Sequence, residues 1–330
     1  MKDKTIKVGI AGAGFMGGTH AENYLMLPNV ELYALAEQNQ HKQKEFLNQY
    51  KVKKIYDDVF EMINDEDIDV VDICLPTPLH AKTAVAALHK NKNVLLEKPV
   101  ALNLEDALLI KEAACQSSGK FMVAHVLRFW PEYLTVRQVI NGYVEGSKIR
   151  EVFATRFNEL PLWSDGTWIM SEDKSGGIIV DLMIHDIDYI LWNWGEVKRV
   201  FCNSISNGQN FPIQALAILE MKNGTVAYIE GGYLNPKGCG LSTQMKLYAE
   251  NTLIETQPLK KTIKLTRTDN NTLEIPVSGN DGYFEEINYF IDCVRNNRQV
   301  KVITTDDAIE SLKVCLSLKK SLKENRWIQL

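Results

Sequence analysis

Short apolar runs alternate with longer amphipathic stretches along the first third of the chain. The apolar runs predict buried strands, and the stretches between them repeat apolar residues with the period of a helix. Regular alternation of strands and helices along the chain is typical of a parallel, doubly wound sheet. The predicted strands cover residues 7–11, 30–36, 70–75, 94–96 and 121–124, and the predicted helices cover 20–27, 41–50, 81–89 and 104–117.

The pattern changes near residue 126. A helix over 133–140 precedes longer strand-like runs with few helices between them, which favours a largely antiparallel sheet. Asn223-Gly224 stands between two such runs and is a strong hairpin signal. We expect helices around 178–193 and 282–296 to cover one face of this sheet. The final helix should begin near Thr305, with Thr304 or Thr305 as its N-cap. The predicted strands cover 149–157, 197–206, 214–221, 225–233, 245–249 and 262–266.

Composition narrows the class of protein. A chain of 330 residues with 45% apolar and 24% charged residues suits two globular domains with real cores. The formal net charge of -5 argues against nucleic acid or an anionic membrane as the main partner. The first apolar run is too short for a signal peptide, and no window has the unbroken apolar length of a membrane span. Six scattered cysteines without a CxxC pair are typical of a reduced, cytoplasmic protein.

A glycine fingerprint follows the first strand. In Gly12-Ala13-Gly14-Phe15-Met16-Gly17, the first glycine allows a tight turn, the second a close approach to a pyrophosphate, and the third close helix–strand packing. Glu37 ends the second strand, where a carboxylate accepts hydrogen bonds from an adenosine ribose. The same carboxylate would repel a 2′-phosphate, so NAD is favoured over NADP, with Lys42 the nearest cation. The alternative is a ligand-free turn and a solvated glutamate.

Two further loops follow strands at the edge where ligands bind in such sheets. One is Leu75-Pro76-Thr77-Pro78-Leu79-His80, in which His80 has either a structural or a chemical role. The other is Glu97-Lys98-Pro99, where Lys98 either points into a cleft or pairs with Glu97. The predicted cofactor-binding residues are Gly12, Gly14, Phe15, Met16, Gly17, Glu37, Leu75, Pro76, Thr77, His80, Glu97 and Lys98.

Residues 176–192 are nearly all apolar, apart from a few ionisable side chains. A helix that is apolar all round is buried. Asp181, His185 and Asp188 are spaced so that they share one face of this helix. Buried charges need partners, so these groups either pair with one another or face a polar cleft. Three such groups in one stripe favour the cleft.

Lys98, Asp181 and His185 together suit the oxidation of an alcohol. A histidine with a near-neutral pKa can take the hydroxyl proton as hydride leaves the carbon. A lysine ammonium can stabilise the developing alkoxide, and a carboxylate can hold a neighbouring hydroxyl. These residues predict an NAD(H)-dependent oxidoreductase acting on a polyhydroxylated small molecule, at a cleft where Lys98 meets His185.

The motifs resemble those of the glucose–fructose oxidoreductase/inositol dehydrogenase (Gfo/Idh/MocA) family over essentially the whole chain. The matching segments are GAGFMG at 12–17, LPTPLH at 75–80, EKP at 97–99, RFWPEY at 128–133, SGGIIVDLMIHDIDYILW at 175–192 and TTDDA at 304–308. One departure is Leu75-Pro76-Thr77 where the family commonly carries Thr-Pro-Asn, which puts the polar contacts of that loop in doubt.

The resemblance implies an α/β fold: a Rossmann domain over 1–126, and an α+β domain with a largely antiparallel open-faced sheet over 127–330. The final helix could pack on the first domain, and the sheet implies a homodimer or homotetramer. The resemblance also implies a cis bond before Pro99, substrate contact by Lys98 and Asp181, and His185 as general base. Arg128 is expected at the substrate or in a structural salt bridge. The remaining predicted substrate-binding residues are Arg156, Trp163 and Trp168, with core packing as the alternative for the tryptophans.

The predicted substrate is a cyclitol, sugar or sugar derivative. Two other functions remain open. Some relatives hold NAD tightly for a transient oxidation during glycoside cleavage, and a regulator could bind nucleotide and sugar without catalysis. The intact Lys98, Asp181 and His185 set argues against the regulator. A metal site is not expected, since the histidines form no HxxxH or Cys/His ligand pattern.

Overall fold

The structure, a computed structural model, describes residues 4–143, 148–161, 168–206, 212–268 and 271–330. The chain divides into two compact units. The first contains Met1–Val126 and Gly282–Ile309, and the second contains Leu127–Asp281 and Glu310–Leu330. Val126, the last residue of the predicted first domain, is also the last residue of the first segment of this unit. Residues 282–309 are grouped with the first unit, although the sequence analysis placed them in the second domain.

A six-stranded sheet forms the centre of the first unit, in the order β3-β2-β1-β4-β5-β6. All neighbouring strands are parallel, as predicted. The connections run outward from β1 to β2 and from β4 to β5, so the β1–β4 junction is the topological switch point where such sheets bind ligands. The strands are β1 (Ile6–Ala11), β2 (Val30–Ala36), β3 (Lys54–Tyr56), β4 (Val70–Ile73), β5 (Asn93–Glu97) and β6 (Phe121–Ala124).

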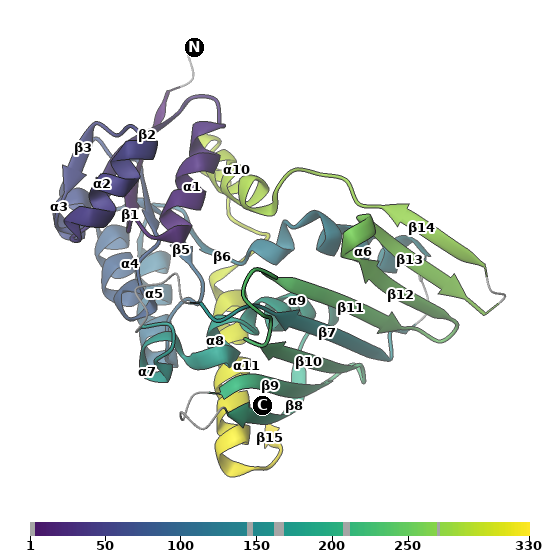
Figure 1. The fold of residues 1–330 in the computed structure, drawn as a ribbon. Coiled ribbons are helices and arrows are strands. Elements are labelled where there is room, and N and C mark those ends of the chain that lie inside the picture. Colours follow the sequence, from purple (N-terminus) through teal and green to yellow (C-terminus); the bar gives the residue numbers. More distant parts are fainter. Residues whose placement is uncertain (1–3, 144–147, 162–167, 207–211, 269–270) are drawn as a thin grey trace. The chain divides into compact units, whose positions relative to one another are not determined.

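Helices connect these strands and cover the sheet (Figure 1). Their starts follow from local chemistry: Asn39 caps α2 and Asn103 caps α5 by accepting backbone N–H groups of the first turn. The helices of this unit are α1 (Phe15–Leu25), α2 (Gln40–Gln49), α3 (Val59–Asn64), α4 (His80–His89), α5 (Leu104–Gln116) and α10 (Gly282–Arg295), with a 3-10 turn at Thr77–Leu79.

Helix α10 corrects one expectation. Residues 282–296 were predicted to cover the second sheet, but α10 packs beside α1 in the first unit (Figure 1). Its apolar face, with Ile287, Phe290 and Ile291, is buried. An amphipathic pattern predicts that a helix has a buried face, but does not identify the surface that covers it.

A nine-stranded sheet dominates the second unit, in the order β14-β13-β12-β11-β7-β10-β9-β8-β15. Among the strand pairs of the described residues, only β7–β10 is parallel, so the prediction of a largely antiparallel sheet is confirmed. The predicted hairpin joins β9 to β10, with Gly224 at φ +86° in its turn. The strands are β7 (Glu151–Phe157), β8 (Val197–Ser206), β9 (Pro212–Met221), β10 (Val226–Gly232), β11 (Ser242–Tyr248), β12 (Thr252–Gln257), β13 (Thr262–Arg267), β14 (Thr272–Pro276) and β15 (Ile328–Gln329).

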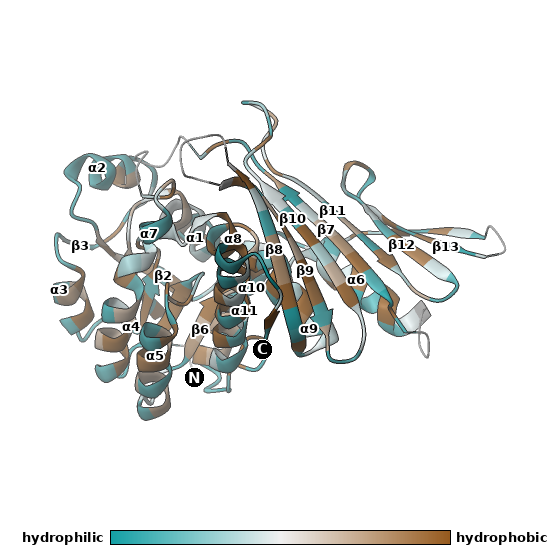
Figure 2. Cartoon of the chain, turned by 90° about the horizontal axis from the view of Figure 1, so that it is seen from below, coloured by the Kyte–Doolittle hydropathy of each residue, from teal (hydrophilic) through white to brown (hydrophobic). Residues whose placement is uncertain are grey.

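Helices pack on this sheet: α6 against β12 and β13, α8 against β9 and β10, and α9 against β10. Burial alternates along β7, where Val152 and Ala154 are buried while Phe153 between them is exposed. Hydrophobic and hydrophilic residues alternate in the same way along the strands in Figure 2. The helices are α6 (Pro131–Tyr143), α7 (Glu172–Ser175), α8 (Gly177–Asp181) and α9 (Ile184–Trp194).

The last helix, α11 (Thr305–Glu324), begins where the sequence predicted. The Thr304 hydroxyl accepts the backbone N–H of Asp307, and the Asp307 carboxylate accepts the backbone N–H of Thr304. This reciprocal pair is a capping arrangement that satisfies two N–H groups at the helix start. No described helix is both long and apolar enough to cross a membrane.

Candidate active site

The glycine turn after β1 has the geometry of an anion cradle. Gly12 has φ +102°, and a Cβ there would lie 2.6 Å from the Cys74 carbonyl oxygen. A Cβ on Gly17 would collide with the Gly12 carbonyl oxygen, so α1 packs closely on the turn. A Cβ on Gly14 would meet no atom within 4 Å, so this side of the turn is open. Helix α1 starts there without a side-chain cap, which leaves its first N–H groups available to bind an anion.

Glu37 lies beside this turn. One of its carboxylate oxygens accepts the backbone N–H of Ala13 at 2.9 Å, and the other accepts that of Asn39 at 2.8 Å. The carboxylate is therefore held next to the glycine turn, as a ribose-binding acid requires. The open cradle, the uncapped helix start and this carboxylate fit the dinucleotide that the sequence predicted. Phe15 and Met16 open α1, with the Phe15 side chain 70% exposed.

The loop after β4 is shaped by a buried histidine. His80 lies within hydrogen-bonding distance of two backbone carbonyls, 2.8 Å from Nδ1 to the oxygen of Pro99 and 2.8 Å from Nε2 to that of Leu75. Burial lowers the pKa of His80 in spite of these contacts. These contacts favour the structural role for His80. Thr77 is buried at the start of the 3-10 turn, and Pro76 is half-buried.

Glu97 and Lys98 follow directly in the neighbouring loop. Glu97 is 6% exposed, whereas Lys98 is half-buried. The Glu97 carboxylate pairs with Nε2 of His20 at 3.1 Å and accepts the backbone N–H of Lys98 at 3.0 Å. The peptide bond between Lys98 and Pro99 is cis, as the family resemblance implied.

The ionisable stretch of the second unit is interrupted rather than one continuous helix. Helix α8 ends at Asp181, and α9 begins at Ile184, so His185 lies in the first turn of a new helix. Asp181 and His185 are both half-buried. The Tyr233 hydroxyl, just after β10, donates to the Asp181 carboxylate at 3.0 Å. Burial, together with this carboxylate, raises the pKa of Tyr233, so its hydroxyl keeps its proton.

Asp188 does not share the surroundings of Asp181 and His185, so this part of the stripe prediction was wrong. Asp188 is fully buried and receives two hydrogen bonds from Arg128, both 2.8 Å long. The Ser311 hydroxyl of α11 also donates to it, at 3.0 Å. The interruption between α8 and α9 breaks the expected helical spacing, and a buried guanidinium needs a carboxylate partner.

The arginines predicted at the substrate have structural partners. Arg156, 4% exposed, donates to the Asp186 carboxylate at 2.6 and 3.0 Å and to the Tyr133 hydroxyl at 2.9 Å. Arg128, 2% exposed, is held by Asp188. Both side chains are thus almost wholly buried in bidentate ion pairs, which favours the salt-bridge alternative given for Arg128 and a core role for Arg156.

Of the two predicted tryptophans, Trp168 is half-buried, and its carbonyl accepts the backbone N–H of Ser171. Trp163 lies outside the described residues.

The sequence analysis did not identify Tyr233 or the pairing of His20 with Glu97. No local pattern marks Tyr233, because its role depends on where β10 ends. His20 had a recognisable signal, since Asp72 interrupts the apolar strand 70–75 and a buried carboxylate needs a partner.

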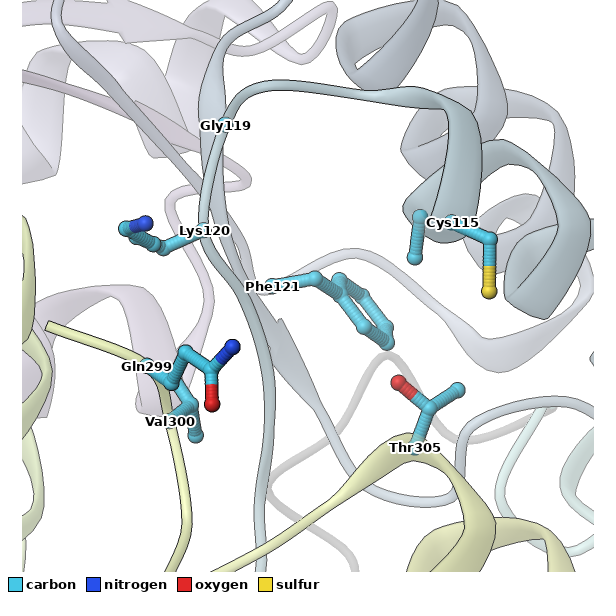
Figure 3. A pocket seen from close by; sticks show the side chains of 8 residues that line it. Cys115, Gly119, Lys120, Phe121, Gln299, Val300 and Thr305 are labelled. Carbon is cyan, nitrogen blue, oxygen red and sulfur yellow. The ribbon is translucent and has the colours of Figure 1, made fainter.

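Figure 3 shows a cavity of about 240 Å³ that is open to solvent. Its lining includes Cys115, Lys120, Phe121 and Gln299. Phe121 pairs with Val94 at the amino ends of β6 and β5, whereas Glu97 lies at the opposite ends. The cavity is therefore at the edge of the sheet opposite the glycine turn and Lys98.

Two family models match the chain. The model described as an oxidoreductase family with an NAD-binding Rossmann fold matches residues 6–125, and the Gfo/Idh/MocA C-terminal domain matches residues 133–255. The chain belongs to the Gfo/Idh/MocA family. The resemblance stated from the motifs is thereby confirmed, and this family member is an oxidoreductase with an NAD-binding domain.

Known proteins match this family member over nearly its full length. Myo-inositol 2-dehydrogenase of Thermotoga maritima is 25% identical, with 98% of each chain covered. The NAD+-dependent scyllo-inositol 2-dehydrogenase of Bacillus subtilis is 24% identical over 98% of this chain and 96% of that protein. The crystal structure of scyllo-inositol dehydrogenase from Lactobacillus casei with NAD(H) and scyllo-inositol superposes with a TM-score of 0.84 at 23% identity, covering 99% of both chains.

Proposed function

We propose that this protein is an NAD(H)-dependent dehydrogenase that oxidises a secondary alcohol of a cyclitol, sugar or sugar derivative, or reduces the matching ketone. The observation that carries the proposal is the pairing of two features. The first unit holds a dinucleotide cradle with Lys98 at the end of β5. The second holds Asp181 and His185, half-buried in a stretch that is otherwise apolar. The names of the inositol dehydrogenases support this substrate class.

Each side chain has one role in the proposed reaction. Bound NAD+ supplies the hydride acceptor. His185 takes the hydroxyl proton as general base. The Lys98 ammonium stabilises negative charge on the substrate oxygen, and Asp181, oriented by the Tyr233 hydroxyl, binds a neighbouring substrate hydroxyl. Glu37 binds the adenosine ribose and disfavours NADP through repulsion of a 2′-phosphate.

The test is a turnover screen of the full-length protein with NAD(H) and NADP(H) against inositols, aldoses, sugar acids and their keto forms. With the best substrate, Lys98→Ala and His185→Ala should each lower kcat by about 10²–10⁴-fold, the usual contribution of a positioned acid or base. NADH binding, followed by fluorescence, should persist. Lys90→Ala and His41→Ala, both at exposed positions, are matched controls. Full turnover by either active-site variant would disprove the assigned roles.

The same screen separates the other two functions. A glycoside hydrolase with tightly held NAD would release cleaved sugar without net change in NADH absorbance. A non-catalytic regulator would bind NADH and a sugar without turnover. The residues that the structure describes contain no specific feature that favours either.

We also propose that a second copy of this chain covers the outer face of the second sheet. Support comes from the apolar side chains exposed there, Phe153, Leu216 and Tyr248, which are 36%, 44% and 40% exposed. Phe153 stacks on Tyr228 with ring centroids 4.6 Å apart, which makes a flat aromatic surface. Lys246 and Glu230 lie opposite Phe153 and Leu216 on the same face, and aromatic side chains flanked by such polar groups are typical of protein interfaces. The six free cysteines support a cytoplasmic location.

A further inference from the structure

Three buried ionisable side chains meet behind the glycine turn of the first unit. His20 comes from α1, Asp72 from β4, and Glu97 from the end of β5. Their exposures are 0%, 0% and 6%. Because an unpaired buried charge is strongly destabilising, each such group needs a partner of opposite charge inside the protein.

The imidazole of His20 lies between two carboxylates. Nδ1 is 2.8 Å from Oδ2 of Asp72, and Nε2 is 3.1 Å from Oε1 of Glu97. A neutral imidazole has one N–H and one lone pair, so it would direct a lone pair at one of these oxygens. An imidazolium donates from Nδ1 to Asp72 and forms an ion pair through Nε2 with Glu97, whereas His80 faces two neutral carbonyls, which attract a positive charge less. One positive charge then offsets the two negative charges.

The second carboxylate connects this cluster to the proposed active site. Oε2 of Glu97 accepts the backbone N–H of Lys98 at 3.0 Å, while Oε1 faces His20. The His20 ring therefore determines where the Glu97 carboxylate lies, and that carboxylate holds the peptide from which the lysine projects. On the other side of Lys98, the carbonyl of Pro99 contacts His80 at 2.8 Å.

We propose that His20 is a positioning residue for Lys98: as an imidazolium between Asp72 and Glu97, it ties the lysine to the helix that starts at the dinucleotide cradle. The proposal rests on the proposed function, in which Lys98 contacts the substrate. His20 itself touches neither substrate nor cofactor in this mechanism. It keeps the lysine and the cradle in a constant relation, because α1 carries both the cradle and the ring.

The surroundings of His20 support this charge state. Desolvation by burial acts to lower the pKa of His20, but the attraction of Asp72 and the contacts with Cys74 hold it well above its ordinary value. Desolvation acts to raise the pKa of Glu97, yet His20 keeps it below its ordinary value. From α10, the Tyr283 ring faces His20 at 6.4 Å between centroids.

The remaining neighbours keep their protons. Burial raises the pKa of the Tyr24 hydroxyl and that of the Cys74 thiol, and the nearby Asp72 carboxylate adds to both shifts. Glu286 of α10 also contributes to the raised pKa of Tyr24. Among the other charged groups in the described part of the chain, Lys98 and His80 help to lower the pKa of Glu97, and Glu286 faces the cluster from α10.

His20, Asp72 and Cys74 also offer donor atoms close enough together to bind a metal ion. The Nδ1–Oδ2 distance of 2.8 Å is instead that of a charge-assisted hydrogen bond. A bound metal would displace the proton from Nδ1. The metal-bound and hydrogen-bonded states therefore differ in the protonation of Nδ1, which can be measured.

The first experiment reads the ring directly in the folded wild-type protein. With ¹⁵N-labelled histidine, the His20 signals are assigned as those that disappear in His20→Gln. We expect both ring nitrogens to be protonated at neutral and mildly alkaline pH. Asp72→Asn should shift deprotonation of His20 to lower pH. A deprotonated Nδ1 or Nε2 in the neutral wild-type protein would overturn the proposal, whether a neutral tautomer or a metal caused it.

The second experiment tests whether His20 acts through Lys98. His20→Gln should lower kcat by about tenfold to a hundredfold, because a displacement of about 1 Å can cost this much, with little change in the Kd for NADH. Repeated in a Lys98→Arg background, which keeps a cation, the same substitution should lower the residual rate far less, because residues that act as a unit are not additive. Rates are normalised to the NADH-binding fraction, so that loss of folded protein is not counted.

The outcomes separate the two proposals. Equal fold losses in the wild-type and Lys98→Arg backgrounds would mean a general structural role and would overturn the positioning role. So would an unchanged kcat in His20→Gln, if Lys98→Ala lowers kcat by the 10²–10⁴-fold proposed above. Full turnover by Lys98→Ala would instead remove the function on which this inference rests. If His20→Gln does not fold, Asp72→Asn replaces it in both experiments. The His20 signals are then those that shift in Asp72→Asn, and the kinetic comparison uses Asp72→Asn in the wild-type and Lys98→Arg backgrounds.

Discussion

Glu37 shows how one carboxylate can be prepared for a ribose. The backbone N–H groups of Ala13 and Asn39 hold its two oxygens, so little side-chain freedom is lost when a ligand binds. The remaining lone pairs can accept hydrogen bonds from the adenosine ribose.

Removing this carboxylate should change cofactor preference. We expect Glu37→Ala to lower kcat/KM for NAD+ by about 10- to 100-fold, the loss of a hydrogen bond to a charged group. The kcat/KM for NADP+ should fall less, because the substitution also removes the repulsion between the Glu37 carboxylate and the 2′-phosphate. Steady-state kinetics with both cofactors measure the ratio, and Glu45→Ala, an exposed residue of α2, is the control. An unchanged ratio would contradict the assigned role.

His80 predicts a pH effect on stability. Its ordinary pKa is 6.5, and burial lowers that value in the folded protein. Between the folded pKa and about pH 6.5 the unfolded chain therefore binds more protons, so stability falls as the solution is acidified and is restored above this window. Thermal unfolding across this pH range measures the effect. As pH falls, the Tm of the wild type should decrease more than the Tm of His80→Gln. Parallel curves for the two proteins would contradict the neutral, buried state.

Helix α9 illustrates a general feature of buried ionisable residues. Asp186 and Asp188 are bound by Arg156 and Arg128, whereas His185 is half-buried. Adjacent positions on one helix thus serve the core and the proposed active site separately. The ion pairs fix the rotation of α9 and so fix the direction in which its other side projects.

Breaking one of these pairs should cost much more than breaking a surface pair. Arg156→Met leaves the Asp186 carboxylate buried without its guanidinium and should lower the free energy of unfolding by about 3–5 kcal/mol. Arg150→Met removes an exposed pair with Glu250 and should cost at most about 1 kcal/mol. Urea unfolding of both variants makes the comparison. Equal losses would show that the Arg156 pair is not isolated from solvent.

The outer face of the nine-stranded sheet gives a prediction about assembly. Phe153 lies near the centre of β7, stacked on Tyr228 and edge-on to Tyr248. Phe153→Glu places a charge in this apolar surface and should shift the protein toward a monomer in sedimentation velocity. Leu259→Glu, at a fully exposed 3-10 turn, is the control and should not. A wild-type monomer, or an unaffected variant oligomer, would contradict the proposed interface.

Elements with strong periodicity were predictable, and weak ones were not. The predicted strands 30–36, 121–124 and 197–206 match β2, β6 and β8 in both bounds. The structure also contains β3, with three residues, and α3, with six, which are too short for a clear period. The break between α8 and α9 was missed because both halves are apolar and continue each other in the pattern.

The parallel first sheet, the antiparallel second sheet and the glycine turn were readable from the chain, because each depends on residue type and spacing over a few neighbouring positions. The partners of the buried charges were not readable. Arg128 with Asp188, Arg156 with Asp186, and His20 with Asp72 and Glu97 join residues that are distant along the chain, and any of these cations could have been assigned to a ligand instead. Local sequence patterns determine which segments are buried, but packing decides which opposite charges meet, because a carboxylate far along the chain neutralises a buried cation as well as a nearby one.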